Sequence, residues 1–312
     1  MRVLFMGSGS VACPALEQLL AHSAYTVVTV VSQPDKPKGR RRSVAPCPAK
    51  AFAEAQGIPV FTPDRIGAPE AIAEVRSLAP DIIVVVAYGQ YIKPEILSIP
   101  PHGAINIHPS LLPKYRGASP IQWALANGET ETGVTILYVS EEMDAGDIIL
   151  QEAVRIDPED TALTLTPRLA GLGANLVVRA LDAIRDKTVE RHAQDESQAT
   201  TVYKLEKSDG RIDWSLPAET IRNRIRGFTP WPGCFTMARN KLLKITKARV
   251  MNESTSAPPG TVVDCASEGP VIATGRGLLV LLEVQPEGRA VMTGSAYLCG
   301  HQFSPGERIG DI

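Results

Sequence analysis

The sequence has 312 residues, of which 44% are hydrophobic and 21% are charged, and its formal net charge is −2. At about 150 residues per domain, this length predicts two globular domains and excludes a largely disordered chain. The longest apolar run, Ile82 to Tyr88, is far shorter than the roughly 18 to 20 residues of a membrane-spanning helix. The apolar stretch after Arg2 is also too short for a secretory signal. We therefore expect a cytoplasmic protein without a membrane partner.

The cysteines and histidines predict no metal site. The five cysteines are widely spread and contain no Cys-x-x-Cys pair, which argues against a disulfide framework and a zinc cluster. The five histidines lack the His-Glu-x-x-His spacing that places two ligands on one helix face. We expect reduced thiols and no bound metal.

The basic residues gather in two zones of the chain. Residues 35–50 contain six basic residues and one acidic residue, and residues 204–250 contain eleven basic and four acidic residues. Two basic zones on an otherwise acidic protein would attract a polyanion to particular surfaces. Charge alone also permits an ordinary solvated surface, because many surface clusters of lysine have no partner.

Strands and helices are predicted to alternate through residues 1–188. The expected strands are 2–6, 25–31, 59–61, 81–87, 103–108, 134–139 and 148–156, and the expected helices are 11–20, 49–56, 68–78 and 162–185. The strand 81–87 shows no polar alternation, which is typical of a central parallel strand covered on both faces. This order predicts an α/β domain with a doubly wound, Rossmann-like, mostly parallel sheet.

The rest of the chain predicts a second, smaller domain. Residues 189–206 are polar and show no clear period, as in a linker. Residues 207–312 have helical spacing at 216–226, followed by short β-rich segments separated by Pro and Gly. Several short strands at close spacing predict a small OB-like β-barrel.

The first expected strand ends in a glycine-rich turn. Gly7-Ser-Gly9-Ser-Val-Ala12 resembles a dinucleotide-binding fingerprint. A nicotinamide enzyme places an Asp or Glu at the end of the second strand to hold the ribose, whereas this strand ends in Val31-Ser32-Gln33-Pro34. We therefore expect no NAD and interpret the glycines as a tight strand-to-helix turn.

Two polar residues at the end of the strand 103–108 could carry chemistry. Asn106 and His108 are two residues apart, so strand alternation directs both side chains to one face, at the carboxyl end where open α/β sheets build their sites. An amide and an imidazole there can stabilise an oxyanion and manage a proton, the two needs of acyl transfer. Hydrogen bonding of both side chains to loop backbone is an equally good interpretation of the spacing.

An acidic turn follows in Met143-Asp144-Ala-Gly-Asp147. Asp144 could hold His108 in one tautomer and favour its charged form, and Asp147 could cap a turn. The sequence does not decide which aspartate faces the histidine. The chain has no Gly-x-Ser-x-Gly motif, which favours direct transfer between two bound substrates over a covalent acyl-enzyme.

These motifs resemble the signature of the 10-formyltetrahydrofolate-dependent formyltransferases. The resemblance comprises Asn-x-His followed by Pro-Ser-Leu-Leu-Pro113, then Lys-Tyr-Arg-Gly117 and Met-Asp144-Ala-Gly. It continues through the basic stretch from Gln33 to Arg40, Lys204-Leu-x-Lys207, Arg211-Ile-Asp-Trp214 and Pro230-Trp-Pro-Gly233. The chain is most similar to family members that formylate the methionine carried by initiator tRNA, and the resemblance covers essentially its whole length.

The resemblance implies a reaction and a set of site residues. Residues 1–188 would form the catalytic domain and bind the formyl donor, 10-formyltetrahydrofolate. The implied folate contacts are Ser110, Leu111, Leu112, Pro113, Tyr88 and Gly89. The amino group of methionyl initiator tRNA would attack the formyl carbon. Asn106 and His108 would then stabilise the oxyanion, and Asp144 would tune His108.

The resemblance also assigns a partner to the basic zones. The implied tRNA contacts are Lys36, Lys38, Arg40, Arg41 and Arg42 in the insertion after the second strand, and Lys204 and Lys207 near the start of the second domain. The second domain would contact the tRNA backbone, and the protein would be a monomer.

Three other functions are compatible with parts of the sequence. A formyltransferase acting on a nucleotide-linked amino sugar shares the catalytic motifs, but the arginine-rich insertion argues against it. Glycinamide ribonucleotide formyltransferase would leave the last hundred or so residues without a role. A non-catalytic RNA-binding protein would not need Asn106, His108 and Asp144 together.

Overall fold

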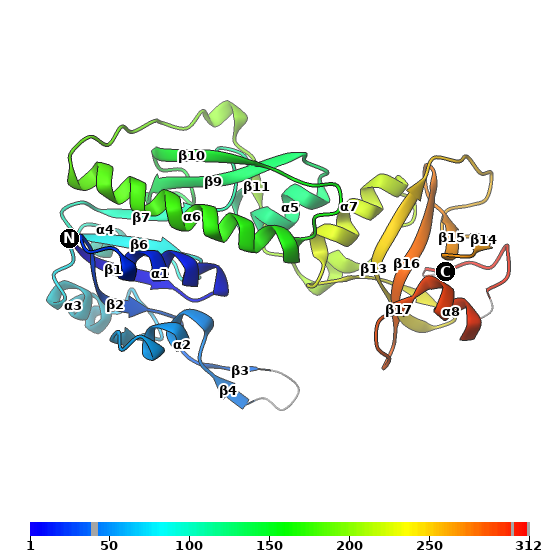
Figure 1. Cartoon of the computed structure of the whole chain (residues 1–312), viewed down its shortest axis with the longest axis horizontal. Helices are drawn as coiled ribbons and strands as arrows, with labels where there is room; N and C mark the ends of the chain where they lie inside the picture. Colours follow the sequence, from blue (N-terminus) through cyan, green and yellow to red (C-terminus); the bar gives the residue numbers. More distant parts are fainter. Residues whose placement is uncertain (39–42, 301–302, 311–312) are drawn as a thin grey trace. The chain divides into compact units, whose positions relative to one another are not determined.

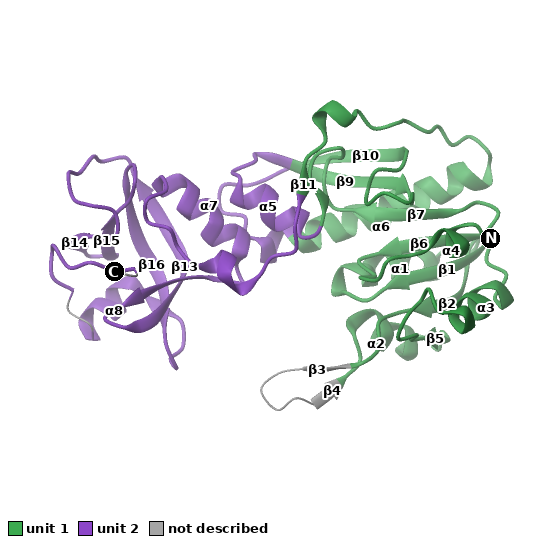
Figure 2. Ribbon diagram, turned by 180° about the vertical axis from the view of Figure 1, so that it is seen from behind, with its two compact units in different colours: residues 1–117, 132–154, 166–201 green, residues 118–131, 155–165, 202–312 purple. Residues whose placement is uncertain are grey.

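The computed structural model describes residues 1–38, 43–300 and 303–310 and divides into two compact units (Figures 1 and 2). Unit 1 comprises Met1–Gly117, Thr132–Val154 and Thr166–Thr201. Unit 2 comprises Ala118–Glu131, Arg155–Leu165 and Val202–Ile312. Unit 2 therefore takes two short segments from the N-terminal part of the chain as well as the whole C-terminal part.

Among the described residues, the centre of unit 1 is a seven-stranded sheet in the order β10-β9-β7-β6-β1-β2-β5. Its strands are β1 (Arg2–Gly7), β2 (Thr26–Val31), β5 (Val60–Phe61), β6 (Ile82–Val86), β7 (Ala104–His108), β9 (Glu131–Tyr138) and β10 (Ile148–Arg155). The pairs β1·β2, β1·β6, β2·β5 and β6·β7 are parallel, and β7·β9 is antiparallel. The predicted Rossmann-like, mostly parallel sheet is confirmed.

Helices pack on both faces of this sheet (Figure 1). They are α1 (Cys13–Ala21), α2 (Pro48–Ala55), α3 (Pro69–Ser77), α4 (Pro94–Leu97) and α6 (Ala162–Arg185). Leu4 and Met6 of β1 form one buried cluster with Val75 of α3. On β7, Ile107 points toward α6, where a Cβ added at Gly173 would lie 2.7 Å from the Ile107 Cγ2 atom. Successive side chains of a strand point to opposite faces of the sheet, so alternate residues pack against the helices on each face.

The sequence missed the short elements. They are η1 (Ser10–Ala12), the antiparallel pair β3 (Lys36–Lys38) and β4 (Ser43–Ala45), β8 (Arg116–Gly117), β11 (Thr201–Val202), α4 and α5 (Pro120–Ala126). An element this short spans at most about two turns or one strand repeat, so it leaves little periodicity to detect. No helix within the described parts of the chain is long and apolar enough to cross a membrane.

Unit 2 is built on an antiparallel sheet in the order β12-β13-β16-β15-β14, with β17 paired to β16. The strands are β12 (Cys234–Ala238), β13 (Lys241–Met251), β14 (Val262–Ala266), β15 (Gly269–Ala273), β16 (Leu278–Pro286) and β17 (Met292–Thr293), with α7 (Ala218–Phe228) and α8 (Gly294–Gly300). Ile221, Ile225 and Phe228 of α7 share a buried core with Leu243 and Leu281 of the sheet. The spacing of these residues by four and three places them on one face of the helix. The helix predicted over 216–226 is thus present, but it begins at Ala218 and extends to Phe228. The predicted small C-terminal β domain is confirmed as an antiparallel sheet domain.

The packing of α7 on α5 within unit 2 depends on a glycine. A Cβ at Gly227 would lie 2.7 Å from the Gln122 carbonyl oxygen and 2.9 Å from the Ala126 amide nitrogen. Since backbone atoms of a helix cannot move aside locally, Gly227→Ala should lower the free energy of unfolding by about 1 to 3 kcal/mol. The change is measured by urea or thermal unfolding.

Gly171→Ala in α6 is the matched control, because its Cβ position has no heavy atom within 4 Å apart from those of its chain neighbours and of the helix's own backbone. Ala is the better helix former, so this variant should be as stable as the parent or more stable. Equal stability of the two variants would contradict the close approach of α5 and α7.

Candidate functional site

The carboxylate of Asp144 is the centre of a polar cluster in unit 1. Asn106 Nδ2 donates to Asp144 Oδ1 at 3.3 Å, and the Gly117 amide donates to Oδ2 at 2.8 Å. His108 Nδ1 lies 3.5 Å from the same Oδ2 atom. Of the two aspartates that the sequence left open, Asp144 rather than Asp147 is therefore the one beside His108.

Strand alternation on β7 brings Asn106 and His108 to this cluster. Ala104, two residues before Asn106, is buried in the core with Leu4, whereas Ile107 points toward α6. Asn106 and His108 therefore leave the face of β7 opposite to Ile107. His108 is the last residue of β7 and is only 4% exposed. The strand ends where open α/β sheets place their ligands.

The hydrogen bonds of His108 define its orientation. Its Nε2 atom lies 2.9 Å from the Tyr115 carbonyl oxygen. Because a carbonyl oxygen only accepts, Nε2 carries a proton and Nδ1 is directed at the Asp144 carboxylate. The 3.5 Å separation of Nδ1 and Asp144 Oδ2 exceeds the roughly 2.7 to 2.9 Å of a tight charge-assisted hydrogen bond. Nδ1 therefore makes no tight hydrogen bond to Asp144.

The turn that carries Asp144 has an unusual backbone. Asp144 has φ 54°, in the left-handed region where Asp is one of the few tolerated side chains. Gly146 follows, and a Cβ there would lie 1.9 Å from the Tyr138 carbonyl oxygen of β9. The Asp-Ala-Gly pattern thus fits this turn in two respects. Asp144 tolerates the left-handed backbone, and Gly146 has no side chain to clash with the Tyr138 carbonyl oxygen.

The loop that follows His108 is shaped by internal hydrogen bonds. Ser110 is fully buried, and its hydroxyl donates to the Lys114 carbonyl oxygen at 2.8 Å. Thr135 Oγ1 donates to the Ser110 carbonyl oxygen at 2.7 Å and accepts from the Leu112 amide at 3.2 Å. Gln151 Nε2 donates to the Leu112 carbonyl oxygen at 2.9 Å and to Thr135 Oγ1 at 2.8 Å. Side chains of β9 and β10 therefore hold this loop in one shape.

The other predicted folate residues differ in exposure. Leu111 and Pro113 are half-buried. Gly89 is exposed with φ 83°, and a Cβ there would lie 2.2 Å from Gln33 Nε2. Tyr88 is 1% exposed, its hydroxyl has no hydrogen-bond partner among the described residues, and burial raises the pKa of its phenol. The Tyr88 side chain therefore belongs to the core, and its neighbour Gly89 offers the accessible surface.

The predicted RNA contacts fall in several parts of the chain. Arg40, Arg41 and Arg42 lie outside the described residues. Lys36 and Lys38 lie on β3. Lys204 and Lys207 are exposed in unit 2.

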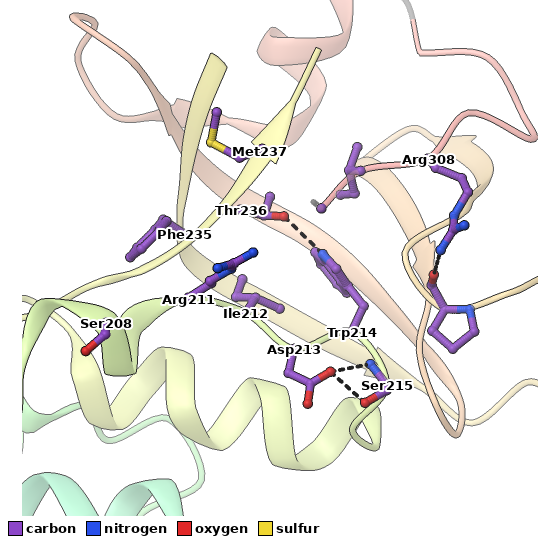
Figure 3. A pocket seen from close by; sticks show the side chains of 13 residues that line it. Ser208, Arg211, Ile212, Asp213, Trp214, Ser215, Phe235, Thr236, Met237 and Arg308 are labelled. Carbon is purple, nitrogen blue, oxygen red and sulfur yellow. Dashed lines mark hydrogen bonds between the residues drawn. The ribbon is translucent and has the colours of Figure 1, made fainter. Parts of the chain in front are cut away.

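A hollow of about 810 Å³ lies in unit 2 beside β12 (Figure 3). Its lining includes Trp214, whose Nε1 atom donates to Thr236 Oγ1 at 3.0 Å, and the side chains of Arg211 and Arg308. All its lining residues belong to unit 2, whereas the polar cluster around Asp144 belongs to unit 1. No sequence pattern predicted this hollow, because its walls come from segments that are far apart in the chain.

Among residues 1–38, 43–300 and 303–310, no group of three or more His, Cys, Asp or Glu side chains could hold a metal ion.

The fold is that of a two-part protein with a mostly parallel α/β unit and an antiparallel sheet unit, and comparison with known proteins identifies its family. The Formyl transferase family model matches residues 1–181, and that of the Formyl transferase C-terminal domain matches residues 204–302. The methionyl-tRNA formyltransferase of Geobacter metallireducens (strain ATCC 53774 / DSM 7210 / GS-15) is 42% identical over 99% of this chain and 98% of its own length. That of Roseiflexus sp. (strain RS-1) is 44% identical over 100% and 96%. This chain belongs to the formyl transferase family.

A solved structure supports the fold assignment independently. The sugar 3N-formyl transferase WlaRD, crystallised in the presence of dTDP and 5-N-formyl-THF, has a TM-score of 0.67 to this structure at 20% sequence identity. The similarity covers 93% of this chain and 99% of that chain. The two-part fold is thus shared by formyl transferases with different acceptors.

The hydroxyl of Thr135 tests how the loop after His108 is held. Thr135→Val keeps the shape of the side chain but leaves the Ser110 carbonyl oxygen and the Leu112 amide without this partner. We expect a loss of about 1 to 3 kcal/mol in the free energy of unfolding and a raised KM for the formyl donor. Urea unfolding and steady-state kinetics measure the two effects. Thr188→Val, at an exposed position after α6, is the control and should change neither the free energy of unfolding nor the KM. If Thr135→Val also left both values unchanged, the loop would not need this hydroxyl.

Proposed function

We propose that this protein transfers the formyl group of 10-formyltetrahydrofolate to the free amino group of methionyl initiator tRNA. The product, N-formylmethionyl-tRNA, serves translation initiation. The support for the acceptor is full-length similarity at 42% and 44% identity to methionyl-tRNA formyltransferases, against 20% identity to the sugar formyl transferase WlaRD. The observation that carries the chemistry is the meeting of Asn106, His108 and Asp144 at the end of β7.

The reaction needs charge stabilisation at one oxygen and transfer of one proton. The amine nitrogen bonds to the formyl carbon, the formyl oxygen becomes an oxyanion, and the bond from the carbon to N10 of the folate then breaks. The amine loses a proton and N10 gains one. Asn106 Nδ2 and His108 Nδ1 supply the oxyanion donors. Because Nε2 carries the proton of the neutral imidazole, Nδ1 donates when the ring is doubly protonated, and both donor nitrogens lie at long distances, 3.3 and 3.5 Å, from the Asp144 oxygens. Asp144 orients both donors and balances a charge on the imidazole ring.

The formyl donor is proposed to contact residues 110–113 and 88–89. Leu111, Pro113 and Gly89 offer accessible surface for the folate. The buried side chains of Ser110 and Tyr88, together with that of Leu112, shape the walls beneath it. WlaRD, which shares the fold, was crystallised with a formylated folate, which supports a folate site in this fold.

The basic residues are proposed to bind the acceptor tRNA. Those in the insertion are Lys36, Lys38, Arg40, Arg41 and Arg42, and those beyond the first unit are Lys204 and Lys207. Lysine and arginine contacts to phosphates position an RNA without reading its bases.

We also propose a division of labour along the chain. Residues 1–188 form the catalytic domain, 189–206 the linker and 207–312 the OB-like tRNA-binding domain, and the protein acts as a cytoplasmic monomer. The family models, at residues 1–181 and 204–302, support two functional regions.

The charge of Asp144 can be removed without changing the size of its side chain. Asp144→Asn should lower kcat by about 100- to 1,000-fold, the cost of losing one preorganised electrostatic group at an oxyanion site. The KD for initiator tRNA should stay within about twofold, because Asp144 does not belong to the basic zones. Single-turnover formylation and filter binding measure the two effects. Weaker tRNA binding at undiminished turnover would remove Asp144 from the chemistry.

The acceptor is tested by comparing three amines with the same formyl donor. Formyl transfer to methionyl initiator tRNA should be rapid and should weaken steeply with salt, as expected for phosphate contacts. Elongator methionyl-tRNA and a nucleotide-linked amino sugar should be poor acceptors. Transfer to the amino sugar alone would keep the catalytic residues and overturn the proposed acceptor.

Arg40→Ala extends this test to the insertion. Loss of one phosphate contact should raise the KM for tRNA and flatten the salt dependence of binding by about one unit of log–log slope. Arg65→Ala, an exposed arginine outside both basic zones, is the control and should change neither value.

A further inference from the structure

A glutamine from the predicted linker lies against the turn that carries Asp144. Gln194 Nε2 donates to the Asp144 carbonyl oxygen at 2.7 Å and to the Gly146 carbonyl oxygen at 2.8 Å. Its Oε1 atom accepts from Arg116 Nε at 3.0 Å and from Arg116 Nη2 at 2.8 Å. A guanidinium only donates and a carbonyl only accepts, so the amide has a single orientation that satisfies all four contacts. The side chain thus uses its full hydrogen-bonding capacity between Arg116 and the catalytic turn.

Arg116 is itself held firmly. It is 8% exposed, and its Nη1 and Nη2 atoms pair with the two carboxylate oxygens of Glu196 at 2.8 and 2.7 Å. The hydrogen bonds that Arg116 donates to Glu196 raise the pKa of the Arg116 guanidinium, so this group stays charged. The Arg116 amide also donates to the Thr200 carbonyl oxygen at 2.8 Å. Bidentate pairing of this kind fixes the guanidinium plane, and with it the place where Gln194 can bind.

The dipeptide Arg116-Gly117 therefore holds Asp144 in two ways. The Gly117 amide donates directly to Asp144 Oδ2 at 2.8 Å. Arg116 holds the Asp144 backbone through Gln194. Asp144 adopts φ 54°, in the left-handed region that Asp tolerates better than most residues, and these two sets of hydrogen bonds help to hold the turn in that conformation.

We propose that Gln194, oriented by Arg116, is a positioning residue that sets the Asp144 carboxylate against Asn106 and His108. This inference rests on the proposed function, because its main readout is formyl transfer. Gln194 does not touch the reacting atoms. Without its two hydrogen bonds, the turn relaxes and the carboxylate leaves the two donors.

Gln194→Met tests the proposal with little change in side-chain size. It removes both donations to the turn and should lower kcat by about 10- to 100-fold, the effect of a displacement of about 1 Å at a catalytic group. The KM values for 10-formyltetrahydrofolate and for tRNA should stay within about twofold, because the binding surfaces are untouched.

Gln198→Met is the matched control in the same segment. The Gln198 amide donates to Asp195 Oδ2 at 2.8 Å rather than to the Asp144 turn. The same substitution at this position should therefore leave kcat unchanged. Equal kcat values in the two variants would overturn the positioning role.

A double variant separates positioning from a general loss of structure. If Gln194 acts only through Asp144, adding Gln194→Met to Asp144→Ala should lower kcat no further than Asp144→Ala alone, within about twofold. Independent, multiplicative losses would contradict the proposal. Should Gln194→Met fold poorly, Arg116→Lys provides the same test, since lysine keeps the charge but lacks the fork that binds Gln194 and Glu196 together.

Formyl transfer by the unsubstituted protein tests the proposed function separately from the positioning role of Gln194. Absence of formyl transfer to methionyl initiator tRNA by the parent would refute the proposed function. Normal transfer by both the parent and Gln194→Met would refute the positioning role alone.

Discussion

The polar cluster of Asn106, His108 and Asp144 depends on one partly buried carboxylate, that of Asp144, having hydrogen-bond donors around it. A carboxylate removed from water without partners costs several kcal/mol, so its place is fixed by whatever donates to it. The Gly117 amide makes the shortest of these contacts, at 2.8 Å, and Asn106 and His108 make longer ones at 3.3 and 3.5 Å. This difference between the distances fits the proposed reaction. A backbone amide holds the charge in place, while the two side chains keep donor capacity for an oxyanion that develops beside them.

The sheet provides this geometry through register as well as direction. β7 runs parallel to β6, which brings Asn106 and His108 to the carboxyl edge, but its other neighbour β9 is antiparallel and pairs Thr135 with His108. One reversal of strand direction therefore places a hydroxyl opposite His108. That hydroxyl organises the loop proposed to contact the folate. A fully parallel sheet would need a crossover connection to bring a strand to this position.

The long elements and the alternation on β7 were predictable from sequence, because each repeats its pattern over several residues. The sequence could not predict which of Asp144 and Asp147 lies beside His108, since both belong to one turn. The left-handed backbone of that turn at Asp144 decides which carboxylate faces His108. Family resemblance named Tyr88, yet its side chain lies in the apolar core. A sequence motif indicates which segment contributes to a site, and packing determines which atoms of that segment are accessible.

The segment around Gln194 shows that the composition of a polar stretch does not reveal the hydrogen bonds it makes to distant parts of the chain. Residues 189–206 lack an apolar period, so pattern analysis interprets them as a linker, but Gln194 acts through hydrogen bonds to residues 50 and 78 positions away. Such contacts leave no trace in local hydropathy. The same stretch runs on to Lys204, three residues after unit 1 ends at Thr201. A continuous piece of chain thus carries both the side chain that holds the Asp144 turn and a proposed tRNA contact.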